Sequence, residues 1–247
     1  MAATDSAGTS ASPSSSLRRR ALLGLLSLLL GAAPAFGESA PAPAAAEPAF
    51  CVPGTFLAHE VPGLAVAGVS RLRVFRLGPA VLAGMAIGDS DAAAVARLAE
   101  GHGATSADRY CTWYVNKGNR EAAKLFRHVY LPNPRHLGPR KAADEYGELF
   151  GPALGPGPDA VWGCLEQRHY VAVGCNGQQH RGPTAFGMVL AALGCEPEHA
   201  AEIVNHLWGL NGVPEANRLA AIRRAYEIGA SQPDLRARLQ RLFGGAN

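Results

Sequence analysis

The chain has 247 residues, 48% of them hydrophobic, and carries 23 Lys and Arg residues against 20 Asp and Glu residues. A net charge of +3 gives no strongly basic surface, so we expect neither nucleic acid nor an anionic membrane as a partner. The length and apolar content suffice for one good core or two small ones.

Residues 1–37 predict a cleaved signal peptide. A basic segment at 18–20 precedes an apolar run over 21–30 and small residues at 33–35. The run is about half of the ~20 residues that a spanning helix needs, so no stable membrane anchor is expected. Arg19 and Arg20, followed by Ala-Leu-Leu, resemble a twin-arginine signal peptide. The resemblance implies recognition by an export translocon and a periplasmic or secreted protein that crosses folded. The general secretory route stays open.

Composition divides the remainder of the chain. Residues 38–49 read as an Ala/Pro linker, and residues 50–247 as a single exported domain. The stretch GPALGPGP at 151–158 is the clearest internal break, either a subdomain boundary or an exposed loop.

The front of the domain predicts strands and then helices. The stretch 66–87 reads as strand-like: Leu72 and Val74 alternate with Arg71 and Arg73, and an apolar run over 81–87 indicates a second strand after the turn Gly78-Pro79. Helices are expected over 91–100, 106–118 and 120–131.

The back of the domain predicts a hairpin and a helical tail. Residues 161–165 and 169–175 read as two strands. Helices are expected over 183–193, 197–208 and 214–228, with a last one that opens at Ser231 and Asp234. The predicted class is α+β, with a small antiparallel sheet or hairpins packed against helices and a helical C-terminal subdomain.

Five cysteines lie beyond the signal peptide: Cys51, Cys111, Cys164, Cys175 and Cys195. An exported protein sits in an oxidising compartment, where disulfides are expected. Five is odd, so at most two bridges form within the chain and one thiol remains. The pairing stays open.

Cys164 and His169 are a candidate metal pair, with Cys175 and His180 close behind in the sequence. Thiols and imidazoles are donors that zinc and copper accept. In the predicted hairpin only Cys164 and His169 share a face at short range, because Cys175 would stand on the order of 13 Å from Cys164. Disulfides with surface histidines are the preferred alternative. The sequence identifies no cofactor.

Cys195 and His199 are a candidate catalytic pair. Pro197 opens a predicted helix, so Cys195 lies near a helix N-terminus with His199 one turn on. A cysteine nucleophile with a histidine base is conceivable there. A buried or bridged cysteine is the preferred interpretation.

Gly88-Asp89-Ser90 follows an apolar strand and resembles the first block of the GDS esterases, in which the serine is the nucleophile. The later aspartate-any-any-histidine block of that family is missing. A helix cap explains Asp89 and Ser90 without catalysis and is preferred.

Trp113, Tyr114 and Asn116 form an aromatic and polar patch that suits a sugar, peptide or other small ligand. Gln179 and His180, in a polar loop, are candidates to line the same site. The alternative is a core segment whose polar tips find local partners.

Three functions follow, in order of preference. The first is an exported binding or structural protein of the cell envelope. The second is an envelope hydrolase with a Cys/His or Ser nucleophile. The third is a metal-binding protein that uses the Cys/His cluster.

Overall fold

The structure is a computed structural model that describes residues 46–101, 111–116, 126–157 and 160–244. The predicted signal peptide, with Arg19 and Arg20, and most of the predicted linker lie outside the described residues. The division into residues 1–37, 38–49 and 50–247 therefore stays a prediction. Within the described residues, no helix is both long and apolar enough to cross a bilayer.

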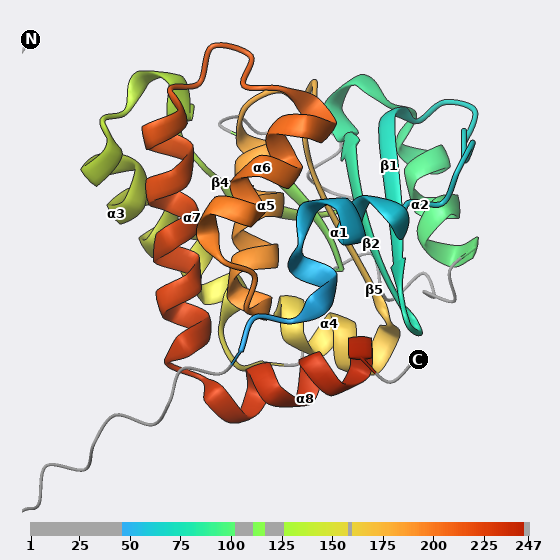
Figure 1. The fold of residues 1–247 in the computed structure, drawn as a ribbon. Coiled ribbons are helices and arrows are strands. Elements are labelled where there is room, and N and C mark those ends of the chain that lie inside the picture. Colours follow the sequence, from blue (N-terminus) through green and yellow to red (C-terminus); the bar gives the residue numbers. More distant parts are fainter. Residues whose placement is uncertain (1–45, 102–110, 117–125, 158–159, 245–247) are drawn as a thin grey trace, which may run out of the picture. The chain divides into compact units, whose positions relative to one another are not determined.

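In the part of the chain that the structure describes, five strands form one sheet with the order β1-β2-β5-β3-β4 (Figure 1). They are listed here in chain order: β1 (Ser70–Leu77), β2 (Ala80–Ala86), β3 (Thr112–Asn116), β4 (Arg127–Tyr130) and β5 (Tyr170–Cys175). Among the strands of the described residues, only β1 and β2 pair antiparallel, whereas β2, β5, β3 and β4 run parallel. The α+β class fits, but the sheet is mostly parallel and not the small antiparallel sheet we expected.

The eight α-helices of the described residues are α1 (Pro53–Ala58), α2 (Ala92–Gly101), α3 (Pro139–Phe150), α4 (Val161–Arg168), α5 (Arg181–Leu193), α6 (Pro197–Trp208), α7 (Glu215–Ala230) and α8 (Pro233–Gly244). The four predicted C-terminal helices correspond to α5–α8, and the predicted helix over 91–100 corresponds to α2. Short 3₁₀ segments cover Ala49–Cys51, Ile87–Asp89, Pro134–His136 and Gly151–Leu154.

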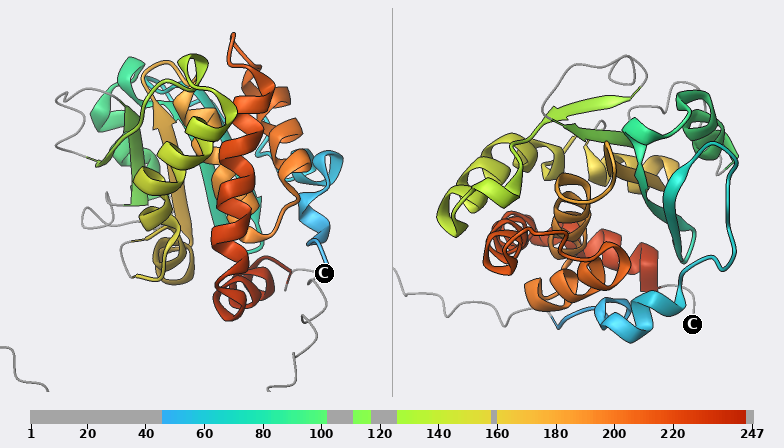
Figure 2. Two further views of the ribbon diagram at one scale, coloured as in Figure 1. Left: turned by 90° about the vertical axis from the view of Figure 1, so that its left-hand side faces the viewer. Right: turned by 90° about the horizontal axis from the view of Figure 1, so that it is seen from above.

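Helix α5 is the centre of the core. Every residue from Gly182 to Leu193 is buried, which explains why its sequence is apolar on all sides. Figure 2 shows α6 and α7 on one side of the sheet and α2 on the other. An apolar strand, β5, therefore leads through a short loop straight into the buried helix.

Three predicted elements are wrong. Residues 161–168 are helix α4 and not a strand, and the helix ends at His169 in a left-handed conformation (φ 51°). The predicted hairpin over 161–175 is thus a helix followed by a strand. Residues 112–116 and 127–130 are strands where helices were expected. For β3 the sequence Thr-Trp-Tyr-Val favours a strand, because β-branched and aromatic side chains fit a buried sheet.

Two disulfides and one free thiol are confirmed. Cys51 bonds to Cys195 and Cys111 to Cys164, with Cα–Cα distances of 4.9 and 5.6 Å. Cys175 is the free cysteine, and it is buried.

Candidate functional site

Cys175 is the last residue of β5, at the carboxyl end of the parallel part of the sheet. β5 lies between β2 and β3 and runs parallel to both. The residues that follow these strands therefore meet at one edge, and in open α/β sheets this edge is where ligands bind. Cys175 is 4% exposed, so its thiol would lie beneath a ligand bound at this edge.

Residues 176–180 form the loop between Cys175 and the first residue of α5, Arg181. No hydrogen bond within the described part of the chain uses the backbone N–H groups of residues 176–180 as donors. Buried backbone donors are normally paired, and this loop is only partly exposed. Five consecutive donors without an internal acceptor are suited to an oxyanion, which accepts several such bonds at once.

Gln178 supports this loop from below. It is fully buried and holds a left-handed backbone conformation (φ 46°), and its Oε1 accepts the N–H of Cys175 at 3.3 Å. A methyl group on Gly182 would stand 2.0 Å from that Oε1, so only glycine fits beneath the loop at this position.

Arg181 brings a guanidinium to the same edge. Its Nε donates to the carbonyl oxygen of Leu131 at 2.7 Å, which anchors the side chain to the segment after β4. No hydrogen bond within the described residues uses its two Nη groups. A guanidinium with two parallel donors left over matches the oxygens of a phosphate in a bidentate arrangement.

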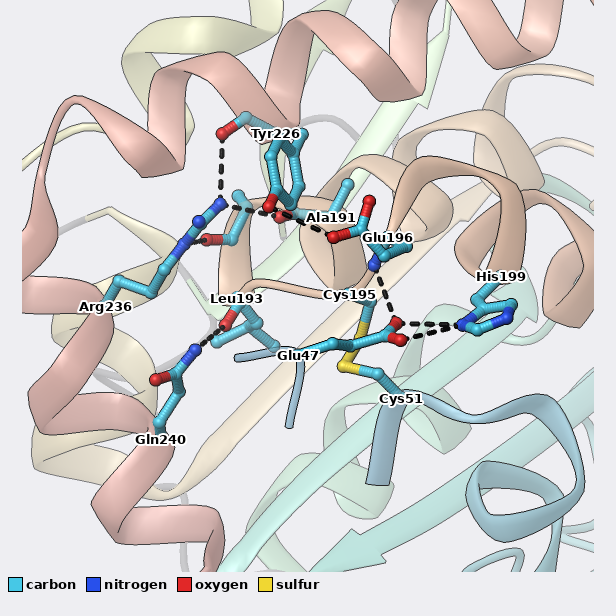
Figure 3. The surroundings of a disulfide bond; sticks show 11 residues. Glu47, Cys51, Ala191, Leu193, Cys195, Glu196, His199, Tyr226, Arg236 and Gln240 are labelled. Atoms are coloured by element: carbon cyan, nitrogen blue, oxygen red, sulfur yellow. Dashed lines mark hydrogen bonds and ion pairs between the residues drawn. A yellow bond between two sulfur atoms is a disulfide. The ribbon is translucent and has the colours of Figure 1, made fainter. Parts of the chain in front are cut away.

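The two ends of α5 differ. At the C-terminal end Arg236, from α8, donates to the carbonyls of Ala191 and Ala192 at 3.2 Å, and Gln240 donates to that of Leu193 at 3.2 Å (Figure 3). Cations at a helix C-terminus oppose its partial negative charge. The N-terminal end, with its partial positive charge, faces the 176–180 loop and carries Arg181. Both features favour an anion there.

Two predicted ligand-binding residues, Tyr114 and Asn116, lie beside this loop. The Nδ2 of Asn116 donates to the Oδ1 of Asn176 at 2.9 Å and to the hydroxyl of Tyr114 at 3.0 Å, and that hydroxyl also donates to Asn176. Tyr114 and Asn116 therefore tie the end of β3 to the first residue of the loop that contains Gln179 and His180. The structure brings these four predicted residues to one edge of the sheet.

Trp113, the remaining predicted ligand-binding residue, is buried in the core. It is 1% exposed, its ring packs edge-on against Phe150, and the guanidinium of Arg127 lies 4.8 Å from its centroid. Successive residues of a strand point to opposite faces, so Trp113 and Tyr114 diverge. Trp113 is a core residue in the structure.

Asp89 and Ser90 follow β2 at the same edge. The N–H of Asp89 donates to the carbonyl of Asn176 at 3.2 Å, and its Oδ2 would stand 3.1 Å from a methyl group placed on Gly177. Ser90 donates its hydroxyl to Ala86 and accepts the N–H of Ser70 at 2.9 Å. Ser90 thus joins the ends of β1 and β2, and the expected helix cap at Asp89 or Ser90 is corrected: the carboxylate of Asp91 accepts the N–H groups of Ala93 at 2.7 Å and Ala94 at 3.2 Å at the start of α2.

Cys195 and His199 attach an N-terminal segment to the start of α6. Cys195 is bonded to Cys51, so it has no thiol to act as a nucleophile, and this prediction is corrected. Figure 3 shows Glu47 beside the disulfide, where its Oε1 accepts the N–H of Glu196 at 2.8 Å and its Oε2 lies 2.9 Å from Nδ1 of His199. The bridge and Glu47 together fasten residues 47–51 to the N-terminus of α6.

The Cys164–His169 metal pair is also corrected. Cys164 is bonded to Cys111, and Nδ1 of His169 lies 3.1 Å from the carbonyl oxygen of Leu165 one turn back in α4. The described residues contain no group of three or more His, Cys, Asp or Glu side chains that would hold a metal ion.

Sequence reasoning missed Cys175 and Arg181 as a pair. The signal was present as an apolar run ending in cysteine, a five-residue polar loop with a glycine, and an arginine that opens a helix. The error in reading residues 161–175 as a hairpin hid it, because Cys175 then became a hairpin end and not the end of a parallel strand. No family model matches the chain, and neither the curated proteins nor the solved structures compared with it yielded a match.

Proposed function

We propose that this protein is an exported cysteine-dependent phosphatase that hydrolyses phosphate monoesters. A single observation carries the proposal: the free thiol of Cys175 precedes five N–H groups without internal acceptors, which lead into a helix N-terminus that begins with Arg181. Cysteine is intrinsically nucleophilic as a thiolate. The surrounding donors fit the nonbridging oxygens of a phosphoryl group.

Selective pairing of the cysteines supports this role. Four of the five cysteines are bridged, and the fifth, at the sheet edge, is not. Disulfides persist in oxidising compartments, which is compatible with export. A thiol kept apart from both bridges and nearly buried is protected from exchange while remaining beside the loop.

The proposed reaction has two steps. The thiolate of Cys175 attacks phosphorus, an S–P bond forms, and the P–O bond to the alcohol breaks while the departing oxygen takes a proton from an acid. Water then attacks phosphorus, the S–P bond breaks, and orthophosphate leaves with the thiolate regenerated. The loop N–H groups and Arg181 stabilise the charge that builds on the equatorial oxygens in both steps.

Asp89 is the acid that the geometry favours. Its carboxyl group lies beside Gly177 of the loop and is exposed, so it has access to the leaving group and to water. A protonated Asp89 would give its proton to the departing oxygen, and the carboxylate would then accept a proton from the attacking water.

The test uses p-nitrophenyl phosphate as the substrate. The wild-type chain is expected to release p-nitrophenol. Cys175→Ser should lose about 10³-fold or more in kcat, because the covalent step is removed. Arg181→Ala should lose about 10²-fold or more. Arg76→Ala is the matched control, because this exposed arginine pairs in register with Val81 at the opposite end of the sheet.

Acid quenching during turnover followed by peptide mass spectrometry should find a phosphoryl adduct on the peptide that contains Cys175. Wild-type rates in Cys175→Ser would overturn the proposal. Phosphate binding without hydrolysis would favour the second candidate, an exported anion-binding protein, which the 4% exposure of Cys175 supports.

A further inference from the structure

We infer that the substrate carries at least two phosphate groups, of which one enters the Cys175 loop and another binds a rim formed by the guanidinium of Arg135 and the imidazole of His180. This inference rests on the proposed function and specifies its substrate class as a small polyphosphorylated molecule.

Three loops meet at the rim. They are residues 131–137 after β4, residues 175–181 after β5, and residues 209–213 between α6 and α7. Nε2 of His180 lies 3.2 Å from the carbonyl oxygen of Asn211, and Nη2 of Arg135 would stand 3.0 Å from a methyl group placed on Gly212. The 209–213 loop therefore has His180 against Asn211 and Arg135 against Gly212.

The charge in these three loops has one sign. Residues 131–137, 175–181 and 209–213 contain Arg135, His136, His180 and Arg181 but no Asp or Glu. Arg135 and His136 are exposed, and His180 and Arg181 are partly exposed. On an ordinary surface charges of both signs are interspersed, whereas a one-sign cluster focuses an attractive potential on an oppositely charged ligand.

Arg218, a buried arginine that contacts the 209–213 loop, adds to this positive potential. Arg218, in α7, is fully buried; its Nη1 donates to the side chain of Asn205 and to the carbonyl of Gly209 at 3.0 Å. Its Nε and Nη2 atoms are buried and have no hydrogen-bond partner, and no carboxylate pairs with it within the described residues. A buried cation without a counter-charge is costly to the fold. An anion at the rim would offset part of that cost.

The pKa of His180 reflects the positive charges around it. Its pKa lies below the usual value, first because of desolvation and then because of Arg135, Arg181 and Arg218, although the hydrogen bond to Asn211 opposes the shift. Three guanidinium groups therefore lie within electrostatic range of one imidazole. One phosphate in the loop engages Arg181 and leaves Arg135 and His180 for a second.

The experiment compares binding of inorganic tripolyphosphate and orthophosphate to the full chain by isothermal titration calorimetry. Tripolyphosphate should bind the wild-type protein at least about tenfold more tightly, because charge-assisted hydrogen bonds to a second phosphate are worth more than the ~1.4 kcal/mol of a tenfold change. Arg135→Ala should reduce that preference severalfold and leave orthophosphate affinity within about twofold. His180→Asn should also reduce the preference severalfold. Arg76→Ala should change neither affinity.

Equal affinities of the wild-type protein for the two anions, or binding of neither, would overturn the inference. So would a preference that Arg135→Ala leaves intact. Hydrolysis of p-nitrophenyl phosphate, measured on the same preparations, reports the proposed function separately. Cys175-dependent hydrolysis without a tripolyphosphate preference refutes only the substrate class. A rim-dependent preference without hydrolysis refutes only the catalytic proposal.

Discussion

Gln178 accepts the backbone N–H of Cys175 with its side-chain Oε1, so the residue three positions after the thiol folds back beneath it. The position of Gln178 depends on Gly182, because any side chain there would collide with Oε1.

Gly182→Ala should therefore displace the loop and lower activity. The added methyl group would stand 2.0 Å from Oε1 of Gln178 and 3.0 Å from the backbone nitrogen of Cys175. We expect a loss of roughly 1–3 kcal/mol in stability from overpacking. We also expect a fall in kcat for p-nitrophenyl phosphate of at least about tenfold, because loop N–H groups stabilise developing charge only when well placed. Chemical denaturation and steady-state kinetics measure the two effects.

Gly54→Ala is the control, because a methyl group on Gly54 meets nothing within 4 Å. It should leave kcat unchanged and should not lower stability, because alanine at an unstrained helical position stabilises the fold. Undiminished kcat in folded Gly182→Ala would mean that the loop conformation is unimportant for turnover.

Asp89→Asn should slow hydrolysis in a way that depends on the leaving group. An alkyl phosphate needs its departing oxygen protonated, so its kcat should fall by about 10²-fold or more. p-Nitrophenolate leaves without that help, so p-nitrophenyl phosphate should lose much less. Parallel kinetics on the two substrates measure the ratio. Asp91→Asn is the matched control: its carboxylate accepts the N–H of Ala93 at 2.7 Å as a helix cap, so it should affect stability and not the ratio. Equal losses on both substrates would exclude proton donation by Asp89.

The helices of the C-terminal part were predictable because residues in the sequence mark where they begin and end. Gly194 ends α5 in a left-handed conformation, and Pro197 and Pro233 open α6 and α8. Proline in a first helical turn and glycine beyond the last are local signals that tertiary contacts seldom override. The β1–β2 pair was predictable for a similar reason, since Gly78 holds a positive φ in its turn.

The parallel core was less accessible from sequence. Strands buried on both faces read as apolar runs without alternation, and α4 presents a run of the same kind. Which run becomes a helix depends on its packing, here of Trp162 and Leu165 in the core. Because the sequence predicts a strand where α4 lies, it places Cys175 at the end of a hairpin and not at the edge of a parallel sheet. The catalytic prediction therefore names Cys195. The number of disulfides followed from parity, but the pairing needed the fold.

The two disulfides should stabilise the fold unequally. The Cys51–Cys195 bridge spans 144 residues and the Cys111–Cys164 bridge 53, and longer closed loops restrict the unfolded chain more. Replacing each pair by serine should cost about 2–5 kcal/mol, with the larger loss for Cys51 and Cys195. Cys175→Ser should cost far less, because Cys175 forms no bridge. Urea denaturation of the oxidised proteins measures all three. A stability loss in Cys175→Ser equal to that of either pair would contradict the observed pairing.

The charge of His180 should make tripolyphosphate binding stronger in acid. Because desolvation and the arginines at 135, 181 and 218 lower its pKa, His180 is neutral at neutral pH and gains its proton only below its usual range near 6.5. A bound polyanion favours the charged imidazole, so affinity should rise as the pH falls through that range. In the absence of ligand the sign reverses: the unfolded chain takes up the proton first, so protonation of His180 makes the folded state less stable as the pH falls below about 6.5. The ligand itself titrates in this interval. The informative quantity is therefore the difference between wild type and His180→Asn, measured by calorimetry from pH 7.5 to pH 5. Parallel curves for the two proteins would show that His180 adds no charge to the rim.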